Sequence, residues 1–532
     1  MMRRLFVATV CAACGGPAPV AADANAALVC GEPARGPAWD GFVDVTEASG
    51  IDFVYDTADF RSGGLAAVDL DGDGLPEVIA GQRAGGFAVY HNLGGMRFER
   101  ATLAAVDAAS ALTSIAAIDL DNDGDLDLVL ARPGSWDVLE NIGHGAFQEA
   151  WHVDVASTPE QVLPVDVDGD GRLDLFFANR DYPVGPASQN RLYLNRGGLV
   201  FADAGVVGPD GLTWAATAFD ADGDGDQDIY VANDALVATF APGTMLASDL
   251  QPDSLLRNDG IDASGIPRFT DIAAGLGMSA PRSSMSAVLG DFDEDGTLDM
   301  FVTNIGAKSL FAHTPNGFVD RADALGVDPY LRIGDVNVPV ACDPTTTHED
   351  CLIVSWSAAL TDFDLDGHDE LLVVNGTRGG LMPPPPTLLV RGDQPTFHEA
   401  SVDLSCPDAR GLVVTDLDGD GDRDLVIAQS VGRLLVIETR GTPAPGTWLD
   451  VRLVGTASNR EGIGAVVSAT LTSGRVVTKP VAAGGTVSSA GPAEAFFGLG
   501  SNAVASLRVL WPSGRHSEVP GPLSGVVTVE EP

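Results

Sequence analysis

Residues 114–130 read SIAAIDLDNDGDLDLVL, and this stretch determines the fold of the chain. Three aspartates, Asp119, Asp121 and Asp123, alternate with other residues and are followed by Gly124 and Asp127. A short apolar run lies on each side, with the length and the β-branched content of a buried strand. The stretch therefore predicts a unit of strand, acidic loop and strand.

The same acidic pattern, Asp-x-Asp-x-Asp-Gly-x-x-acid, occurs seven times in the sequence. The copies are about 50 to 70 residues apart, a period typical of stacked supersecondary units that cannot fold alone. We number these copies loops 1 to 7 in chain order. The candidate metal ligands are Asp69, Asp71, Asp73 and Glu77 (loop 1); Asp119, Asp121, Asp123 and Asp127 (loop 2); Asp166, Asp168, Asp170 and Asp174 (loop 3); Asp220, Asp222, Asp224 and Asp228 (loop 4); Asp291, Asp293, Asp295 and Asp299 (loop 5); Asp362, Asp364, Asp366 and Glu370 (loop 6); Asp416, Asp418, Asp420 and Asp424 (loop 7).

The spacing of these carboxylates predicts one Ca²⁺ in each loop, about seven ions in all. Carboxylates at alternate positions converge when the chain coils tightly, and glycine at the sixth position permits that turn. The ninth-position acid closes the shell. An all-oxygen flexible cage suits Ca²⁺, whereas Mg²⁺ demands stricter octahedral geometry and Zn²⁺ favours histidine or cysteine. Four carboxylates about 5 Å apart repel one another by roughly 5 to 20 kcal/mol, so bound cations are expected rather than solvated acidic turns.

EF-hands share the first six positions of this pattern, but they require a bidentate glutamate at position twelve. Position twelve is apolar in every copy, and an apolar strand-like run precedes and follows each loop. The unit is therefore not helix, loop, helix. The residues at position twelve are Ala80, Leu130, Phe177, Val231, Val302, Val373 and Ile427.

Each repeat continues with a third apolar run that ends in a glycine-rich turn, such as residues 89–94. A fourth segment led by phenylalanine follows in several repeats, as at Phe201, Phe269 and Phe318. Four strands in each of seven repeats predict an all-β fold, a seven-bladed β-propeller. Residues 42–46 have no acidic loop before them and the last repeat lacks a fourth segment, so we expect the N-terminal strand to close the ring.

Residues 446–525 alternate apolar and polar side chains, which predicts a small β-rich domain after the linker at residues 441–446. We expect Trp511 to be buried against a turn. The predicted domains are a signal peptide with a lipobox at residues 1–14, a flexible linker at 15–40, the propeller at 41–445 and the C-terminal β domain at 446–532.

The acidic loops resemble the FG-GAP/VCBS repeats in the propellers of integrin α-chains and many bacterial surface proteins. Four C-terminal motifs, in order, resemble the ASPIC/UnbV domain: NREGIGA at 459–465, AGG at 483–485, FGLG at 497–500 and VLWPSG at 509–514. The combination is similar to that of the cartilage acidic protein 1 family and its bacterial relatives, over residues 41–530. The resemblance implies the propeller and its calcium, and it implies a C-terminal module of unsettled function.

The N-terminus has the features of an export signal. Basic Arg3 and Arg4 precede a short apolar run, and small residues precede Cys14 as in a bacterial lipoprotein box. This pattern predicts cleavage before Cys14 and lipidation of its thiol. The alternative is ordinary cleavage near residues 21–23. Either way we expect a protein that is secreted or held at the cell surface or outer membrane.

Four further cysteines suit export, since disulfides persist in oxidising compartments. Cys342 and Cys351 bracket a short loop and are the expected disulfide, which leaves Cys30 and Cys406 as a second pair by elimination. Their spacing is not that of a zinc site.

The formal net charge of −45 argues against nucleic acid and anionic membranes as partners. No hydrolase, metalloprotease or nucleotide-binding motif occurs, so we expect no catalytic residues and a non-enzymatic protein. The expected function is binding, adhesion or scaffolding, with an unidentified protein or glycan as ligand. The alternative is a propeller-based polysaccharide lyase or hydrolase. The tripeptide Arg391-Gly392-Asp393 matches an integrin-binding sequence, which chance explains better.

Overall fold

Almost all regular structure in the described part of the chain is β-strand. The helical elements are short: α2 (Thr46–Ser49), α4 (Ala322–Leu325), η1 (Pro186–Ser188) and η3 (Ala273–Leu276). None of the helices in the described residues has the length and hydrophobicity needed to cross a membrane. A computed structural model of the chain describes residues 38–56, 61–181, 184–235, 251–279, 282–328, 331–333, 336–338, 354–376, 386–392, 396–402, 404, 407–440 and 447–532.

Some predictions concern residues outside these ranges. The export signal with Cys14, the Cys342–Cys351 disulfide, and both Cys30 and Cys406 lie there. They stay predictions.

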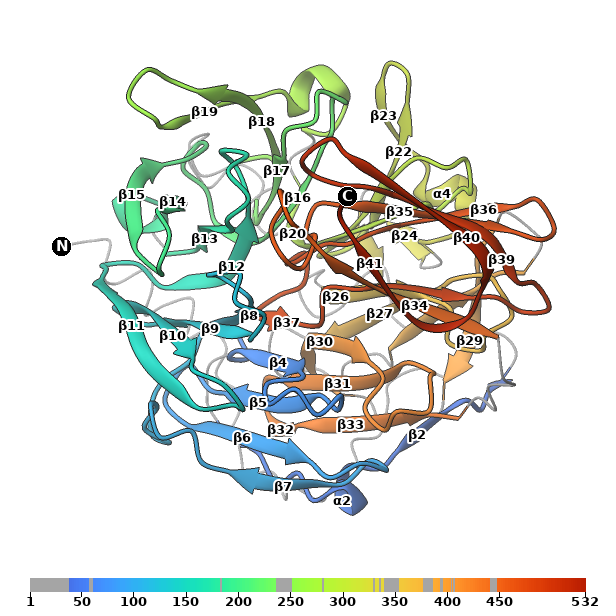
Figure 1. The fold of residues 1–532 in the computed structure, drawn as a ribbon, viewed down its shortest axis with the longest axis horizontal. Coiled ribbons are helices and arrows are strands. Elements are labelled where there is room, and N and C mark those ends of the chain that lie inside the picture. The colour runs from blue at the N-terminus through green and yellow to red at the C-terminus, as the bar shows by residue number, and fades with distance from the viewer. Residues whose placement is uncertain are drawn as a thin grey trace.

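Each acidic loop joins the first two strands of a four-stranded antiparallel sheet, which we call a blade. In the described residues seven such sheets surround a common centre (Figure 1). Blades 1 to 4 are β4 (Leu65–Val68), β5 (Glu77–Gly81), β6 (Phe87–Asn92), β7 (Phe98–Ala101); β8 (Ser114–Ile118), β9 (Asp127–Arg132), β10 (Ser135–Asn141), β11 (Phe147–Asp154); β12 (Pro159–Val165), β13 (Asp174–Asn179), β14 (Arg191–Asn195), β15 (Phe201–Val206); and β16 (Thr213–Phe219), β17 (Asp228–Asn233), β18 (Ser254–Ile261), β19 (Pro267–Asp271).

Blades 5 to 7 follow the same plan, and the innermost strands of neighbouring blades lie side by side around the whole ring. The prediction of a β-propeller is confirmed. The strands are β20 (Ser284–Gly290), β21 (Asp299–Asn304), β22 (Ser309–Thr314), β23 (Gly317–Asp320); β26 (Val354–Thr361), β27 (Glu370–Gly376), β28 (Thr387–Val390), β29 (His398–Val402); and β30 (Ala409–Thr415), β31 (Asp424–Gln429), β33 (Leu435–Thr439), β2 (Phe42–Asp44). Two small pairs complete this part, β3 (Val54–Tyr55) with β32 (Gly432–Arg433) and β24 (Leu331–Ile333) with β25 (Val336–Val338).

Apolar side chains fill the spaces between the blades. Trp136 of blade 2 stacks on Phe177 of blade 3 with ring centroids 3.7 Å apart, and both are fully buried. The second strand of each blade is buried on both faces, as in β13 and β27. Since both faces of each sheet are covered, these strands need continuous apolar runs rather than alternating ones.

The N-terminal strand closes the ring, as the sequence predicts. Strand β2 pairs antiparallel with β33, so that Phe42 lies opposite Thr439 and completes blade 7. The predicted flexible linker extends too far, however. Ala38 and Trp39 form β1 (Ala38–Trp39), which pairs parallel with β29 of blade 6. Trp39 packs near Phe42, with ring centroids 5.8 Å apart, and this burial orders the end of the segment.

The C-terminal residues form a small β domain with two sheets around a separate core. Trp511 is buried in this core and its Nε1 donates to the Ser517 hydroxyl at 2.9 Å, as expected for a packed aromatic. One sheet contains β38 (Ala495–Gly498), β34 (Trp448–Val454) and β41 (Gly525–Glu530); the other contains β36 (Val476–Pro480), β35 (Val466–Leu471), β39 (Val504–Leu510) and β40 (His516–Leu523).

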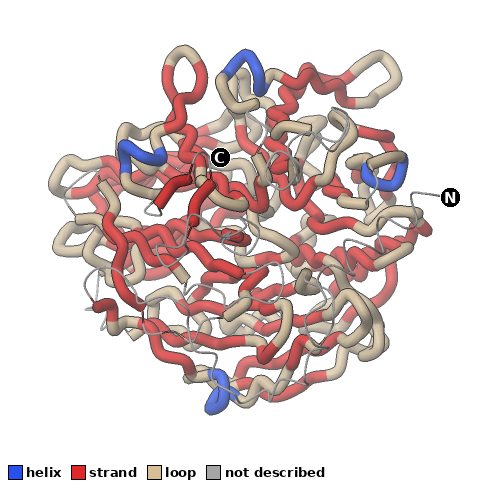
Figure 2. The backbone as a smooth tube through the Cα atoms, turned by 180° about the vertical axis from the view of Figure 1, so that it is seen from behind, coloured by secondary structure: helices blue, strands red, loops and turns tan. Residues whose placement is uncertain are grey.

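A segment of this domain, residues 481–492, enters the centre of the propeller, where Figure 1 shows β37 (Ser489–Ala490). We call it the plug. Strand β37 pairs parallel with β4, and Val487 packs with Trp214 and Trp356. Backbone hydrogen bonds tie Gly485 to blades 4 and 5. A cavity of about 250 Å³ remains, lined mainly by apolar residues of the inner strands. Seen from behind in Figure 2, the strands again surround the centre.

Glu531 fixes a turn of the C-terminal domain. Its carboxylate accepts the N–H groups of residues 456–458 at 2.7–2.8 Å and hydrogen bonds with the hydroxyls of Ser458 and Ser513. Burial alone raises the pKa of Glu531, but the hydrogen bonds from Ser513 and this turn outweigh burial and lower the pKa to about 2. The ionised form is therefore the one that stabilises the fold.

We expect Glu531→Gln to lower the free energy of unfolding by about 2–3 kcal/mol at pH 7, because an amide cannot accept all these bonds. A depressed folded pKa gives stability that is present above the unfolded value near 4.5 and is lost toward pH 2. Urea unfolding at several pH values should therefore show the deficit shrinking below about pH 4.5. Glu518→Gln, on an exposed strand position, is the control. An equal deficit at neutral pH and near pH 2 would contradict the role of the charge.

Candidate metal sites

The first aspartate of each loop organises the backbone of that loop. In loop 3, Asp166 accepts the N–H groups of Gly169, Asp170 and Gly171 at 2.9, 3.2 and 2.9 Å. Gly171 has φ +80°, a left-handed conformation that glycine adopts without strain. The first aspartates of the other loops accept the same kinds of backbone N–H groups. The local sequence thus dictates the coil of the loop.

The ninth-position acid has a role that the sequence did not reveal. In loop 3, one oxygen of Asp174 accepts the Val167 N–H at 3.2 Å and the other accepts the Asn195 N–H at 2.7 Å. The corresponding acids accept equivalent bonds in the other loops, for example Asp127 and Asp424. This acid therefore joins the loop to the third strand of its blade, and its remaining lone pairs face the loop.

The carboxylates of the loops converge on shared points. The ligand atoms of Asp119, Asp121 and Asp127 lie within 4.8 Å of one another, and so do those of three residues in each of loops 1, 3 and 4. The fifth-position aspartates lie nearer the rim. Asp123, for example, is exposed and accepts the N–H of Asp125 at 2.9 Å. Three-residue groups that combine positions one, three and nine are Asp119, Asp121 and Asp127; Asp166, Asp168 and Asp174; and Asp220, Asp222 and Asp228.

Loops 3 and 5 each contain a buried carboxylate oxygen that accepts no hydrogen bond. Asp168 Oδ1 in loop 3 and Asp293 Oδ1 in loop 5 are buried and accept no hydrogen bond. A buried unpaired carboxylate oxygen is costly. Its presence at the third position of an oxygen-lined loop fits a hard cation such as Ca²⁺, which takes six to eight oxygen ligands.

Burial also shifts the protonation of these groups. It raises the pKa of Asp127 to about 8, of Asp291 to about 7 and of Asp119 to about 6, with neighbouring loop carboxylates adding to the effect. The pKa values of Asp174 and Glu370 also lie well above their usual range because both are buried. Without a cation these loops would hold protons near neutral pH, so cation binding competes with protonation and weakens as the pH falls.

An asparagine at the end of the third strand links neighbouring loops. In blade 3, Asn195 Nδ2 donates to the Leu120 carbonyl of loop 2 at 2.8 Å and to the Leu173 carbonyl at 3.2 Å. Asn92, Asn141 and Asn258 donate in the same way to the loop of the preceding blade, and Asn92 of blade 1 reaches loop 7. Sequence reasoning missed this role, although the recurring Asn-x-Gly after the third strand was its signal.

We expect Asn195→Ala to lower the free energy of unfolding by about 3 kcal/mol, because two buried carbonyls would lose their donor. Chemical denaturation in calcium-containing buffer measures the change. Asn316→Ala, in an exposed turn, is the matched control and should change stability by less than about 0.5 kcal/mol. Equal effects of the two substitutions would contradict the link between loops.

Blade 6 uses arginine for the same purpose, which agrees with the interpretation of the Arg-Gly-Asp tripeptide as a chance match. Arg391 is buried, donates to the Phe292 carbonyl of loop 5 and lies over the Phe397 ring at 4.8 Å. Its guanidinium also pairs with Glu294 at 3.2 Å. A buried arginine cannot be read by a partner protein.

The C-terminal domain rests on the same loops. The Arg460 N–H donates to Asn122 Oδ1 of loop 2 at 2.8 Å, and Glu461 accepts the Asp119 N–H at 2.9 Å. On loop 6, Arg475 donates to the Gly367 carbonyl and Lys479 pairs with Asp369. The NREGIGA motif is therefore a docking element for a loop.

Two family models match the chain. Residues 69–130, 119–177 and 166–231 match the FG-GAP-like repeat, and residues 455–526 match the ASPIC and UnbV domain. The chain thus carries FG-GAP-like repeats in its propeller and an ASPIC and UnbV domain at its C-terminal end, which confirms the resemblance seen in the sequence. No curated protein matches the chain significantly.

Several solved structures are similar in fold. BBS1N from its complex with ARL6DN is 12% identical, with a TM-score of 0.43, over 77% of this chain and 99% of that chain. An Agrocybe aegerita lectin that recognises non-reducing terminal N-acetylglucosamine is 16% identical (TM-score 0.34; 72% and 91% covered). The V. cholerae biofilm matrix protein Bap1 is 11% identical (TM-score 0.29; 88% and 62% covered). Such low values carry no information on ligand or activity.

Proposed function

We propose that this chain is an exported, calcium-binding β-propeller that serves as a binding or scaffold protein at the cell surface, with about one Ca²⁺ in each acidic loop. The observation that carries the proposal is the convergence of loop carboxylates, as in loop 3, where the buried Asp168 Oδ1 lacks a donor. Repetition of such loops around a ring indicates a structural role for the ions. The geometry is compatible with a rigid platform whose outer surface binds a protein or a glycan.

In this proposal the loops would hold the ion through the carboxylates at positions one, three and nine, with position five at the rim. Calcium supplies positive charge and six to eight coordination positions for these oxygens. The chain itself presets the site, because backbone N–H groups already orient the first and ninth carboxylates. Less side-chain entropy is then lost on binding.

A non-enzymatic role is supported by the plug. Enzymes on propellers need an accessible pocket with convergent polar groups, and here residues 481–492 occupy the centre of the ring. The cavity that remains is lined largely by alanine, valine, leucine and isoleucine. A polysaccharide lyase or hydrolase would need its acid and base elsewhere.

Two experiments test the proposal. Elemental analysis of protein dialysed against micromolar Ca²⁺ should give about seven ions per chain, and an ion-free protein would overturn the calcium assignment. A glycan array and a pull-down from the cell envelope, both with calcium-loaded protein, should identify a ligand that EDTA releases. Turnover of a polysaccharide in the same array would overturn the binding-protein assignment.

A further inference from the structure

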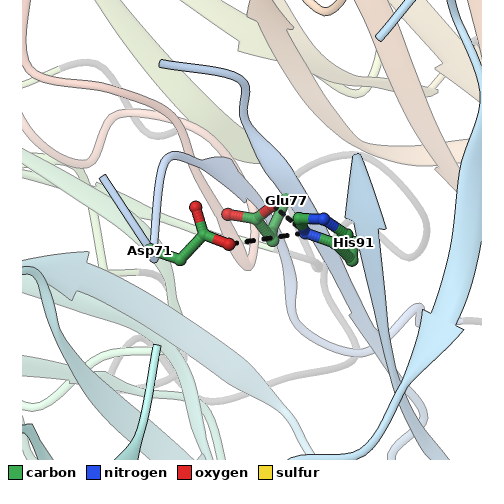
Figure 3. A group of neighbouring side chains, drawn as sticks. All are labelled: Asp71, Glu77 and His91. Carbon is green, nitrogen blue, oxygen red and sulfur yellow. Dashed lines mark hydrogen bonds and ion pairs between the residues drawn. The ribbon is translucent and has the colours of Figure 1, made fainter. Parts of the chain in front are cut away.

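A histidine nitrogen lies beside the carboxylates of loop 1. His91, in the third strand of blade 1, directs its Nδ1 toward the loop (Figure 3). Nδ1 lies 3.0 Å from Glu77 Oε1 and 3.5 Å from Asp71 Oδ2. The three ligand atoms lie within 4.8 Å of one another, so a single ion could contact all of them.

Other blades have a residue at the position that His91 occupies in blade 1, so the residue types at this position can be compared. His91 immediately precedes Asn92, the asparagine that links neighbouring loops. The residues that precede the equivalent asparagines are Glu140, Leu194 and Arg257 in blades 2, 3 and 4. Among these four blades, therefore, blade 1 alone offers an imidazole at this point.

The chemistry of the donor set favours a different class of metal from that of the other loops. Imidazole nitrogen is a poor ligand for Ca²⁺ but suits Zn²⁺, Co²⁺ and Ni²⁺, especially together with carboxylates. Glu77 is buried, and its Oε2 is held by the Leu70 N–H at 2.9 Å, so this ligand is already oriented. The side chains of His91 and Asp71 are 34% and 29% exposed, which lets an ion enter from solvent.

We propose that Asp71, Glu77 and His91 form a binding site for a divalent transition metal of the zinc class, with its other coordination positions open to water. Asp71 also belongs to the all-aspartate group of Asp69, Asp71 and Asp73. The carboxylates of loop 1 can therefore serve Ca²⁺ or, together with His91, a metal that accepts mixed nitrogen and oxygen ligands in its place. This proposal rests on the proposed function only in treating loop 1 as a cation site.

The test uses the full chain in millimolar Ca²⁺, with Co²⁺ as a spectroscopic probe and Zn²⁺ as competitor. We expect one Co²⁺ per chain with visible d–d absorption, displaced by one equivalent of Zn²⁺. His91→Gln should weaken Co²⁺ binding by roughly tenfold or more, and Asp71→Asn should do the same. His516→Gln, at an exposed strand position in the C-terminal domain, is the matched control and should bind Co²⁺ as the unaltered chain does.

Calcium is counted on the same samples, which separates the two proposals. Full calcium content with Co²⁺ binding that is equal in the His91→Gln variant and the unaltered chain would overturn the transition-metal site alone. Absence of calcium together with His91-dependent Co²⁺ binding would overturn the calcium assignment and support the site. Circular dichroism and the melting temperature of His91→Gln establish that a loss of binding is not a loss of fold. If His91→Gln unfolds, the Co²⁺ affinity of the Asp71→Asn variant is the measurement that supports or overturns the site.

Discussion

Chelation of divalent cations is expected to lower the melting temperature of this protein by roughly 20 °C. A site with free Ca²⁺ at about a hundred times its dissociation constant contributes about 2.7 kcal/mol. About seven such sites contribute on the order of 20 kcal/mol, and in a chain of this size each kcal/mol shifts the melt by about 1 °C. Calorimetry in millimolar CaCl₂ and in EDTA measures the shift, with re-addition of Ca²⁺ to establish reversibility.

A single substitution separates loss of the ion from damage to the fold. Asp168→Asn removes a charge from loop 3, where Oδ1 is buried without a donor. The variant should melt several degrees lower than the unaltered chain in Ca²⁺ but at a similar temperature in EDTA, because without the cation the burial of this carboxylate and its repulsion by Asp170 offset its ion pair with Arg196. Asp154→Asn, with a side chain 95% exposed, is the control. A melt that EDTA leaves unchanged would show that the loops are not structural cation sites.

Local sequence was sufficient to predict the loops and the strands around them. The coil of each loop is set by bonds that span at most seven residues, such as those from Gly171 to Asp166 and from Val167 to Asp174. Such bonds depend on the motif itself. Ring closure was also predictable, because Phe42 begins a strand that no repeat otherwise requires, and the last repeat lacks one.

Contacts between distant segments escaped prediction for a physical reason. Asn195 reaches Leu120 across 75 residues, and the Arg460 N–H reaches Asn122 across 338 residues. In neither contact does the spacing of residues along the sequence identify the partner. The burial of Arg391 depends in the same way on Phe292 and Phe397, which the tripeptide does not contain. The sequence did not predict that residues 481–492 enter the ring, because the glycines of this segment resemble those of any turn.

Gly485 of the plug lies where no larger side chain fits. Gly485 has φ +82°, and a Cβ there would lie 2.4 Å from the Ala287 carbonyl oxygen, closer than real Cβ atoms approach. Its own N–H donates to the Ala216 carbonyl at 3.0 Å, and its carbonyl accepts the Ala287 N–H at 2.9 Å. A larger residue therefore cannot occupy this position unless the plug moves and both bonds break.

We expect Gly485→Val to lower the free energy of unfolding by about 4 kcal/mol or more, the sum of left-handed strain and two lost buried hydrogen bonds. Gly474→Val is a matched control, because Gly474 has φ +90° but a Cβ at this position would have no other atom within 4 Å. It should cost only the strain of about 1–2 kcal/mol. Urea unfolding measures both, and proteolysis within residues 481–492 should rise only in Gly485→Val. Equal losses of stability and equal resistance to the protease in the two variants would show that the plug does not attach the C-terminal domain to the centre of the ring.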